Sequence, residues 1–352
     1  HIYRGEEMTK KCTYKNYKLI PFLLIIFILI GCKKGAQKPD ISKKENLPKT
    51  PKVLTELEDE VLKIMYDLDS VAGIEKAIKE EKALKAKETA SIAASAKPII
   101  LSKSDKAKKN KKKKESTKKT KEEKQPEATG EDTSTEIKEP VGMQELIMEN
   151  EIIIPLLEAN EVKGSFSEST TPPSDINTVW TKINDNVTKV HKKWNVLEAQ
   201  LPVEKTSSEK TKDFEKTLND LTLSVMDKKR LDSIKPANKL TEITANFRGY
   251  FDGMGNHDVY KMYYHTRAVI LSAATDDYAG AMEHLNEIRK TGDSMRRDLI
   301  KKNSEDILKK FELSIEDLEE QLTDKNFYLS LIKAPIVIKN IKLIQDTFET
   351  QK

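Results

Sequence analysis

Tyrosine and histidine side chains gather in one stretch of the sequence, between residues 250 and 284. Imidazoles can bind metal ions, and tyrosine with arginine is common at protein interfaces. His257 and His265 are eight residues apart, whereas a zinc-binding helix carries histidines four apart beside a carboxylate. We therefore expect no metal, and two interpretations stay open: aromatic rings on a bundle surface, or a protein-binding patch. The patch would consist of Arg248, Tyr250, Tyr260, Tyr264 and Arg267.

Sequence motifs of known catalytic sites are absent. The glycines at 253 and 255 lack the third glycine and the preceding strand of a dinucleotide-binding fingerprint, so a turn between helices is expected there. There is no nucleophile elbow and no phosphate-binding loop, and we see no close pair of acids in an apolar setting that would suggest general acid–base catalysis. Of the two cysteines, Cys12 would be removed with the N-terminal export signal described below, which leaves Cys32 alone and excludes a disulfide framework and a multi-cysteine metal site. We predict neither enzymatic activity nor a cofactor.

Charge is strongly segregated, although the net charge is only +4. Residues 103–124 contain twelve lysines against four acids, and residues 127–168 contain eleven acids against two lysines. The lysine block could bind a polyanion such as a glycosaminoglycan or anionic lipid, or it could be a solvated linker beside its acidic neighbour. It has no arginine and no interleaved aromatic residue, so no nucleic-acid partner is expected. The candidate polyanion contacts are Lys108, Lys109, Lys111, Lys112, Lys113, Lys114, Lys118 and Lys119.

Cys32 follows a lysine-rich start and a twelve-residue apolar run, residues 19–30. A helix of that length rises only ~18 Å against a hydrocarbon core of ~30 Å, so the run is typical of an export signal rather than a membrane span. The junction Leu29-Ile30-Gly31-Cys32 resembles the lipobox of bacterial lipoproteins. That resemblance implies cleavage before Cys32 and attachment of diacylglycerol to its sulfur.

The chain divides into segments of different composition. We interpret residues 1–7 as an upstream segment translated by mistake, with Met8 as the start and residues 8–31 as the signal peptide. Residues 32–52 should form a flexible leash, residues 53–80 an amphipathic helix, and residues 81–173 a largely disordered charged tether. The apolar run at 152–157 could pack on the main domain as a strand or an irregular segment.

Apolar residues recur at three- and four-residue steps in two parts of the chain. The stripe from Leu54 to Val71 must be covered by the main domain, by a second copy in a homodimer, or by a partner. The pattern returns over residues 174–352, and both tryptophans, Trp180 and Trp194, are expected in its core. Strand signals are nearly absent. The sequence therefore predicts an all-α protein, with a C-terminal bundle of six to eight helices.

The chain resembles plasmid-encoded outer-surface lipoproteins of Lyme-disease Borrelia. The start Met8-Thr-Lys-Lys, the segment from Phe22 to Lys34, the lysine- and glutamate-rich tether and the helical C-terminal half carry the resemblance. It is closest to the thirty-seven-kilodalton immunogenic lipoproteins, and looser to the helical virulence-associated lipoproteins. The resemblance implies a lipid-anchored protein on the outer membrane, at the cell surface. It also implies a host ligand, such as a complement regulator, an immunoglobulin or a matrix component.

Three functional hypotheses follow. The first is a surface protein for immune evasion or adhesion that binds a host macromolecule through its helical domain. The second is a structural lipoprotein that faces the periplasm and has no host ligand. The third is an enzyme or solute-binding lipoprotein, which would need a deep polar cleft. We favour the first.

Overall fold

The structure is a computed structural model that describes residues 49–95, 151–169, 171–202, 204, 206–251 and 256–349. The described residues all fall within one compact unit. Throughout the described ranges the regular structure is helical and no strand occurs, which confirms the all-α prediction. The lipidation motif at residues 29–32 and the lysine block at residues 108–119 lie outside the described residues.

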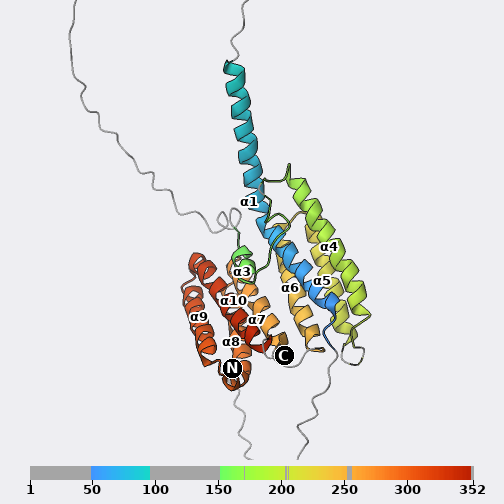
Figure 1. The fold of residues 1–352 in the computed structure, drawn as a ribbon, viewed down its shortest axis with the longest axis vertical. Coiled ribbons are helices and arrows are strands. Elements are labelled where there is room, and N and C mark those ends of the chain that lie inside the picture. Colours follow the sequence, from blue (N-terminus) through green and yellow to red (C-terminus); the bar gives the residue numbers. More distant parts are fainter. Residues whose placement is uncertain are drawn as a thin grey trace, which may run out of the picture. The chain divides into compact units, whose positions relative to one another are not determined.

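Eight of the helices form two rings of four (Figure 1). The first ring consists of α1 (Lys52–Ser95), α4 (Ile176–Glu198), α5 (Ser208–Met226) and α6 (Arg230–Arg248). The second ring consists of α7 (Asn256–Ala273), α8 (Tyr278–Lys301), α9 (Glu305–Thr323) and α10 (Phe327–Glu349). Within each ring, every helix contacts the next and the last contacts the first. The rings meet where α6 packs on α7, and the short helix α3 (Ile154–Ala159) contacts both α1 and α10.

Apolar stripes of the helices fill the core of each ring. Within the first ring of helices, the indole of Trp194 stacks on the phenyl group of Phe214, with their centroids 3.9 Å apart. The phenyl group of Phe247 lies 5.9 Å from the same indole. Trp180 and Trp194 are both buried, as the sequence predicted. Such aromatic contacts add to the free energy of area burial, so this cluster anchors α4, α5 and α6 to one another.

The α1 stripe is covered by the protein's own helices. Leu54, Leu57, Val61, Ile64 and Leu68 are fully buried, and α1 packs on both α4 and α6. A second copy or a partner is therefore not needed to cover this stripe. The packed core also begins at α1 rather than at residue 174, because α1 and α3 belong to the same compact unit as the C-terminal helices.

Helix α1 is longer than the expected segment of residues 53–80 and ends at Ser95. Beyond Ile78 its described side chains are exposed or half-exposed, and Leu84 is 59% exposed. This part is rich in Ala, Glu and Lys, which favour helix, and Glu81 pairs with Lys85 one turn later at 2.6 Å. Local propensity therefore continues the helix where packing against the bundle has ended.

A buried carboxylate on α1 holds the start of α3. One oxygen of Asp69 accepts hydrogen bonds from the backbone N–H groups of Ile152, Ile153 and Ile154, at 2.7, 2.7 and 3.0 Å. The first N–H groups of a helix have no partner within the helix, so Asp69 caps α3 from another element. The apolar run at residues 152–157 is thus helical from Ile154 on, where we had expected a strand or an irregular segment.

A second buried carboxylate, Asp67, fixes the segment that follows α3. Its oxygens accept hydrogen bonds from Ser165 N at 2.5 Å, Ser165 Oγ at 2.6 Å and Asn186 Nδ2 of α4 at 3.3 Å. A Cβ at Gly164 would overlap the ring of Tyr66, so only glycine allows this close approach. The segment of residues 163–165 is thereby held against α1.

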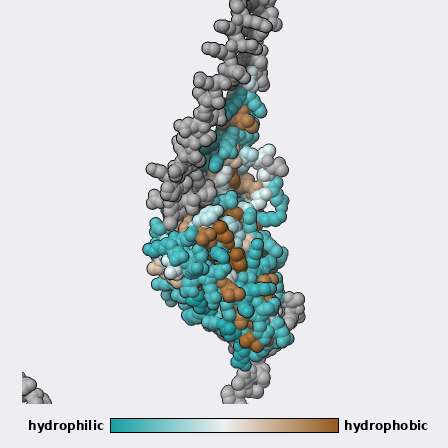
Figure 2. Space-filling model, turned by 90° about the vertical axis from the view of Figure 1, so that its left-hand side faces the viewer, coloured by the Kyte–Doolittle hydropathy of each residue, from teal (hydrophilic) through white to brown (hydrophobic). Residues whose placement is uncertain are grey.

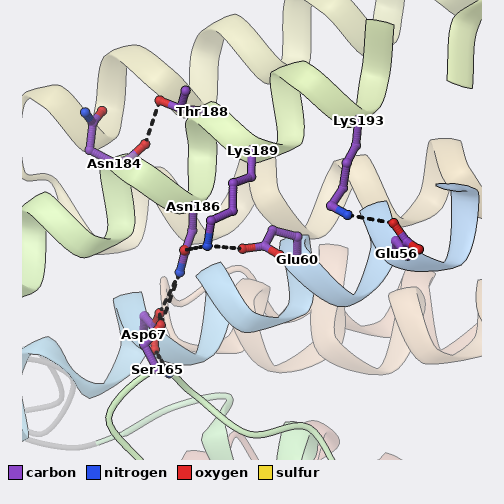
Figure 3. Close-up of polar contacts among 9 residues, drawn as sticks. All are labelled: Glu56, Glu60, Asp67, Ser165, Asn184, Asn186, Thr188, Lys189 and Lys193. Carbon is purple, nitrogen blue, oxygen red and sulfur yellow. Dashed lines mark hydrogen bonds and ion pairs between the residues drawn. The ribbon is translucent and has the colours of Figure 1, made fainter. Parts of the chain in front are cut away.

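Ion pairs continue this contact along the surface between α1 and α4. Lys189 Nζ lies 3.3 Å from Glu60 and 2.8 Å from Asn186 Oδ1, and Lys193 Nζ lies 2.9 Å from Glu56 (Figure 3). Lys189 thus contacts both Glu60 and Asn186, and Asn186 in turn donates to the buried Asp67. The ion pairs at the surface are in this way connected to the buried carboxylate. This polar row selects one alignment of α1 on α4, which apolar contacts alone would not specify.

Four helices of the two rings end in the same tight turn. The turn residues Lys228, Asp276, Asn303 and Lys325 have φ between 53° and 59°, in the left-handed region. In each case the following N–H bonds to a carbonyl five residues earlier, for example Lys229 N to Ser224 O at 3.0 Å. Such turns usually use glycine, and here lysine, asparagine and aspartate adopt the conformation. The turns join α5 to α6 and connect the four helices of the second ring.

None of the helices in the described ranges combines the length and the apolar character that crossing a membrane requires.

We predict that Asp69→Asn lowers the free energy of unfolding by about 2–3 kcal/mol, because a charged acceptor of three backbone N–H groups is replaced by a neutral amide. Urea unfolding followed by circular dichroism measures the change. Asp175→Asn is the matched control: Asp175 caps α4 from an exposed position, and Asn caps equally well there, so a change of only a few tenths of a kcal/mol is expected. Equal losses in the two variants would contradict the role of Asp69.

Candidate functional site

A cavity of about 430 Å³ lies where α1, α6, α7 and α10 meet. The residues Asn160–Lys163, which follow α3, close one side of it. The cavity is therefore built from both rings and from the segment that Asp67 and Asp69 hold in place. Its charged lining residues are Glu58, Asp59, Lys63, Glu161, Lys163, Arg248, Arg267 and Lys342.

A buried ion pair forms one wall. Arg248 Nε donates to both oxygens of Glu58 at 2.9 Å, and Arg248 Nη2 donates to Glu58 and, at 3.2 Å, to Thr55 Oγ1. The guanidinium also lies 3.9 Å from the ring centre of Tyr260. Burial raises the pKa of Glu58, while the charge and hydrogen bonds of Arg248 oppose that rise. Both groups of the pair are thus satisfied by each other.

Arg267 is buried beside this pair but has only neutral hydrogen-bond partners. It is 3% exposed, and its Nε and Nη2 donate to Asn238 Oδ1 and Thr241 Oγ1, both at 2.8 Å. Burial lowers the pKa of Arg267 to about 10, so the guanidinium is still charged at neutral pH. In the described part of the chain, no carboxylate lies within ion-pairing distance of it.

Phenol and amide groups complete the polar lining. Tyr263 Oη donates to Gln345 Oε1 at 3.0 Å, and Gln345 Nε2 reaches Tyr260 Oη at 3.5 Å. Burial raises the pKa of Tyr260 to about 12 and raises that of Tyr263 as well. Both phenols therefore stay protonated and act as hydrogen-bonding groups rather than as bases.

The expected patch of Arg248, Tyr250, Tyr260, Tyr264 and Arg267 is not one exposed surface. Arg248, Tyr260 and Arg267 meet at the cavity, and both arginines are buried. Tyr250 lies apart, where its hydroxyl accepts a hydrogen bond from Lys210 at 2.8 Å, and Tyr264 is buried against His265. Arg248 is bound by Glu58 and Thr55 of α1, and Arg267 is bound by Asn238 and Thr241 of α6. Both are buried, so they are not available to a protein partner docking on the surface.

Sequence reasoning missed the residues that α1 and α10 bring to the cavity, chiefly Glu58, Lys63 and Gln345. A signal for Glu58 exists: it directly follows Leu57 and precedes Val61 of the apolar stripe, so it lies at the edge of the buried face. Nothing in the sequence pairs Glu58 with Arg248, because 190 residues separate them.

Two histidines of the aromatic stretch do come together. His265 Nδ1 lies 3.0 Å from His284 Nδ1, and both rings lie near that of Tyr264. Burial and the neighbouring His284 lower the pKa of His265 to about 4, and burial lowers the pKa of His284. Throughout the described ranges, His, Cys, Asp and Glu do not gather in groups of three that could hold a metal ion. The pair therefore acts as a neutral hydrogen-bonded contact between α7 and α8.

The largest exposed apolar feature of the second ring runs along α10. Five side chains are 36–63% exposed at steps of one, three, four and seven residues, which gives a stripe ~22 Å long on one side of the helix. Figure 2 views the side on which α9 and α10 lie in Figure 1 and shows hydrophobic surface gathered there. The members of this α10 stripe are Tyr328, Leu329, Ile332, Ile336 and Leu343.

We predict that Arg248→Met and Glu58→Leu each lower the free energy of unfolding by about 3–5 kcal/mol, because each leaves a buried charge without its partner. The double variant should be more stable than either single variant, since it removes both charges and leaves apolar side chains of similar volume. Urea unfolding of all four proteins measures this. Additive losses would contradict the coupling.

The His265–His284 pair should make stability depend on pH. The folded-state pKa of His265, about 4, lies below its usual value of 6.5, so the unfolded chain binds protons first and stability falls as pH drops from about 6.5 to about 4. We expect His265→Gln/His284→Gln to show a weaker loss of melting temperature over this window than the unaltered chain. If melting temperature falls equally with pH in the variant and in the unaltered chain, the histidine pair is not the cause of the pH dependence.

Comparison with protein-family models finds no match, and comparisons with curated proteins and with solved structures find none either. A function must therefore be inferred from the residues and geometry of the chain itself.

Proposed function

We propose that this chain is a lipid-anchored protein of a bacterial outer membrane that binds a host protein at the cell surface, with the α10 stripe as its contact. The α10 stripe is the observation that carries the binding part of the proposal, because an exposed apolar surface of this kind often marks an interaction site. The anchor rests on the sequence, in which Cys32 follows an apolar run typical of an export signal.

The charges around the α10 stripe favour a partner with acidic groups. Between Tyr328 and Leu343, the two ends of the α10 stripe, the helix carries three lysines and no acid, and Asp346 and Glu349 follow at its C-terminal end. Lys333 pairs with Asp317 at 2.8 Å and Lys342 with Glu161 at 2.7 Å, whereas Lys339 has no ion pair within the described residues. A surface with apolar residues inside an acidic rim would complement this face.

The same charges argue against pairing of two α10 stripes. A two-fold dimer brings the same patch of both subunits together, so lysines on one copy would approach lysines on the other. Like charges in such an interface cost free energy. A different protein is therefore the better occupant, of the kind that the sequence resemblance suggests: a complement regulator, an immunoglobulin or a matrix component.

A second candidate function rests on the lysine block at residues 103–124, which could bind a sulfated glycosaminoglycan. Salt distinguishes the two, because contacts between lysines and a polyanion weaken steeply with salt and apolar contacts do not. A structural lipoprotein facing the periplasm is a further alternative, and it would bind neither a host protein nor a glycosaminoglycan.

We predict that Ile332→Ser/Ile336→Ser weakens binding to a host protein at least about tenfold, since each truncation in the centre of an interface typically costs more than ~1 kcal/mol. The chain from residue 33 is immobilised and titrated with purified complement regulator, immunoglobulin G, fibronectin and heparin at low and physiological salt. Leu223→Ser/Met226→Ser on α5 is the matched control, because these side chains are 62% and 67% exposed outside the α10 stripe.

Salt-tolerant binding of one protein, lost in the α10 variant and kept in the α5 variant, would support the proposal. Binding of that protein with equal affinity by both variants would overturn the role of α10. Binding of heparin alone, and only at low salt, would favour the lysine block. Failure to bind any of these ligands, together with resistance of the protein to protease added to intact cells, would favour the periplasm-facing alternative.

A further inference from the structure

The guanidinium of Arg267 carries a buried positive charge that the protein does not neutralise nearby. Among the described residues, Glu58 is the carboxylate whose charge acts on Arg267, and it is engaged by Arg248 through several hydrogen bonds. A buried charge without a counter-charge is costly, so such groups in proteins normally have a partner. Arg267 is one of the residues that line the cavity.

Three of the five N–H groups of Arg267 remain available. One Nε–H is used by Asn238 and one Nη2–H by Thr241, and these two bonds hold the guanidinium plane in position. Both N–H groups of Nη1 and the second of Nη2 have no acceptor among the described residues. The Nη1 and Nη2 edge is a planar fork that matches the two oxygens of a carboxylate.

The rest of the cavity suits a small negatively charged molecule. Besides Arg267, four cationic side chains and three carboxylates line it. Lys63 is one of these cations, and its charge also acts on Asp67. Tyr263 and Gln345 add hydrogen-bonding groups, while Leu62 and Val162 provide apolar contact. A volume of about 430 Å³ lies within the usual range for small-molecule sites.

We propose that this cavity binds a small organic acid, whose carboxylate accepts hydrogen bonds from the Nη1 and Nη2 edge of Arg267. Asn238 and Thr241 position the guanidinium, and Lys63 contributes to the positive potential at the wall. The site is separate from the α10 stripe, so it does not depend on the proposed host partner. It adds a small-molecule ligand to a protein whose sequence contains no motif for one.

Isothermal titration of the chain from residue 33 tests the site with benzoate and acetate as probes. Benzamide and acetamide are the uncharged counterparts, and inorganic phosphate tests a different oxyanion. Arg267→Gln removes the charge, and Leu62→Trp fills the cavity while leaving Arg267 in place. Arg289→Gln is the matched control, because Arg289 pairs with Glu319 on another face, 2.6 Å from it.

We expect saturable binding of a carboxylate probe at one site, weakened at least about tenfold by Arg267→Gln and by Leu62→Trp and unchanged in Arg289→Gln. The amides should bind at least about tenfold more weakly than the matching acids. If circular dichroism shows that Arg267→Gln does not fold, the affinities of Leu62→Trp and Arg289→Gln for the carboxylate probes are compared instead, and this comparison decides whether the cavity is the binding site. No binding of either carboxylate, equal binding of the amides, binding of phosphate alone, or undiminished binding by the folded cavity variants would overturn the proposal.

Discussion

Three buried carboxylates on one helix determine how this protein is assembled. Glu58, Asp67 and Asp69 all lie on α1, and each has a different partner: Arg248 of α6, the segment at residue 165 with α4, and the start of α3. An apolar stripe alone would tolerate small shifts of α1 along its neighbours. A buried carboxylate is stable only where its donors are in place, so three of them within twelve residues fix both the position and the rotation of α1. The cavity exists because this arrangement brings α1, α3, α6, α7 and α10 to one point.

The repeat of apolar residues predicted the fold class and most helices, because burial of one face imposes a three- and four-residue spacing that is visible in the sequence. Trp180 and Trp194 were assigned to the core for the same reason and are buried. The continuation of α1 to Ser95 was missed, since it depends on local propensity and has no buried stripe. The four tight turns were equally hidden, because left-handed lysine, asparagine and aspartate leave no glycine to mark them.

The candidate site was predictable only in part. Arginine and tyrosine were expected to act together between residues 248 and 267, and Arg248, Tyr260 and Arg267 do meet. They meet inside the molecule, however, because the residues that cover them come from α1 and α10, far away in the sequence. Contacts between distant segments are set by how the two rings pack on each other, which a single sequence does not specify. The exposed face of α10 was not predicted: this helix is rich in apolar residues, and the second ring buries only one side of it.

The two rings differ in how far apart in the chain their partners lie. In the second ring, short turns connect consecutive helices, so contacts form between neighbours. The first ring closes through Glu58 and Arg248, whose separation is 190 residues. Loop closure over such a distance carries a larger entropic cost than pairing of adjacent helices, and folding slows as contacts become less local. During synthesis, which proceeds from the N-terminus, the apolar stripe of α1 therefore stays partly uncovered until α6 has been made. This interval is when the chain is most open to aggregation and most in need of a chaperone.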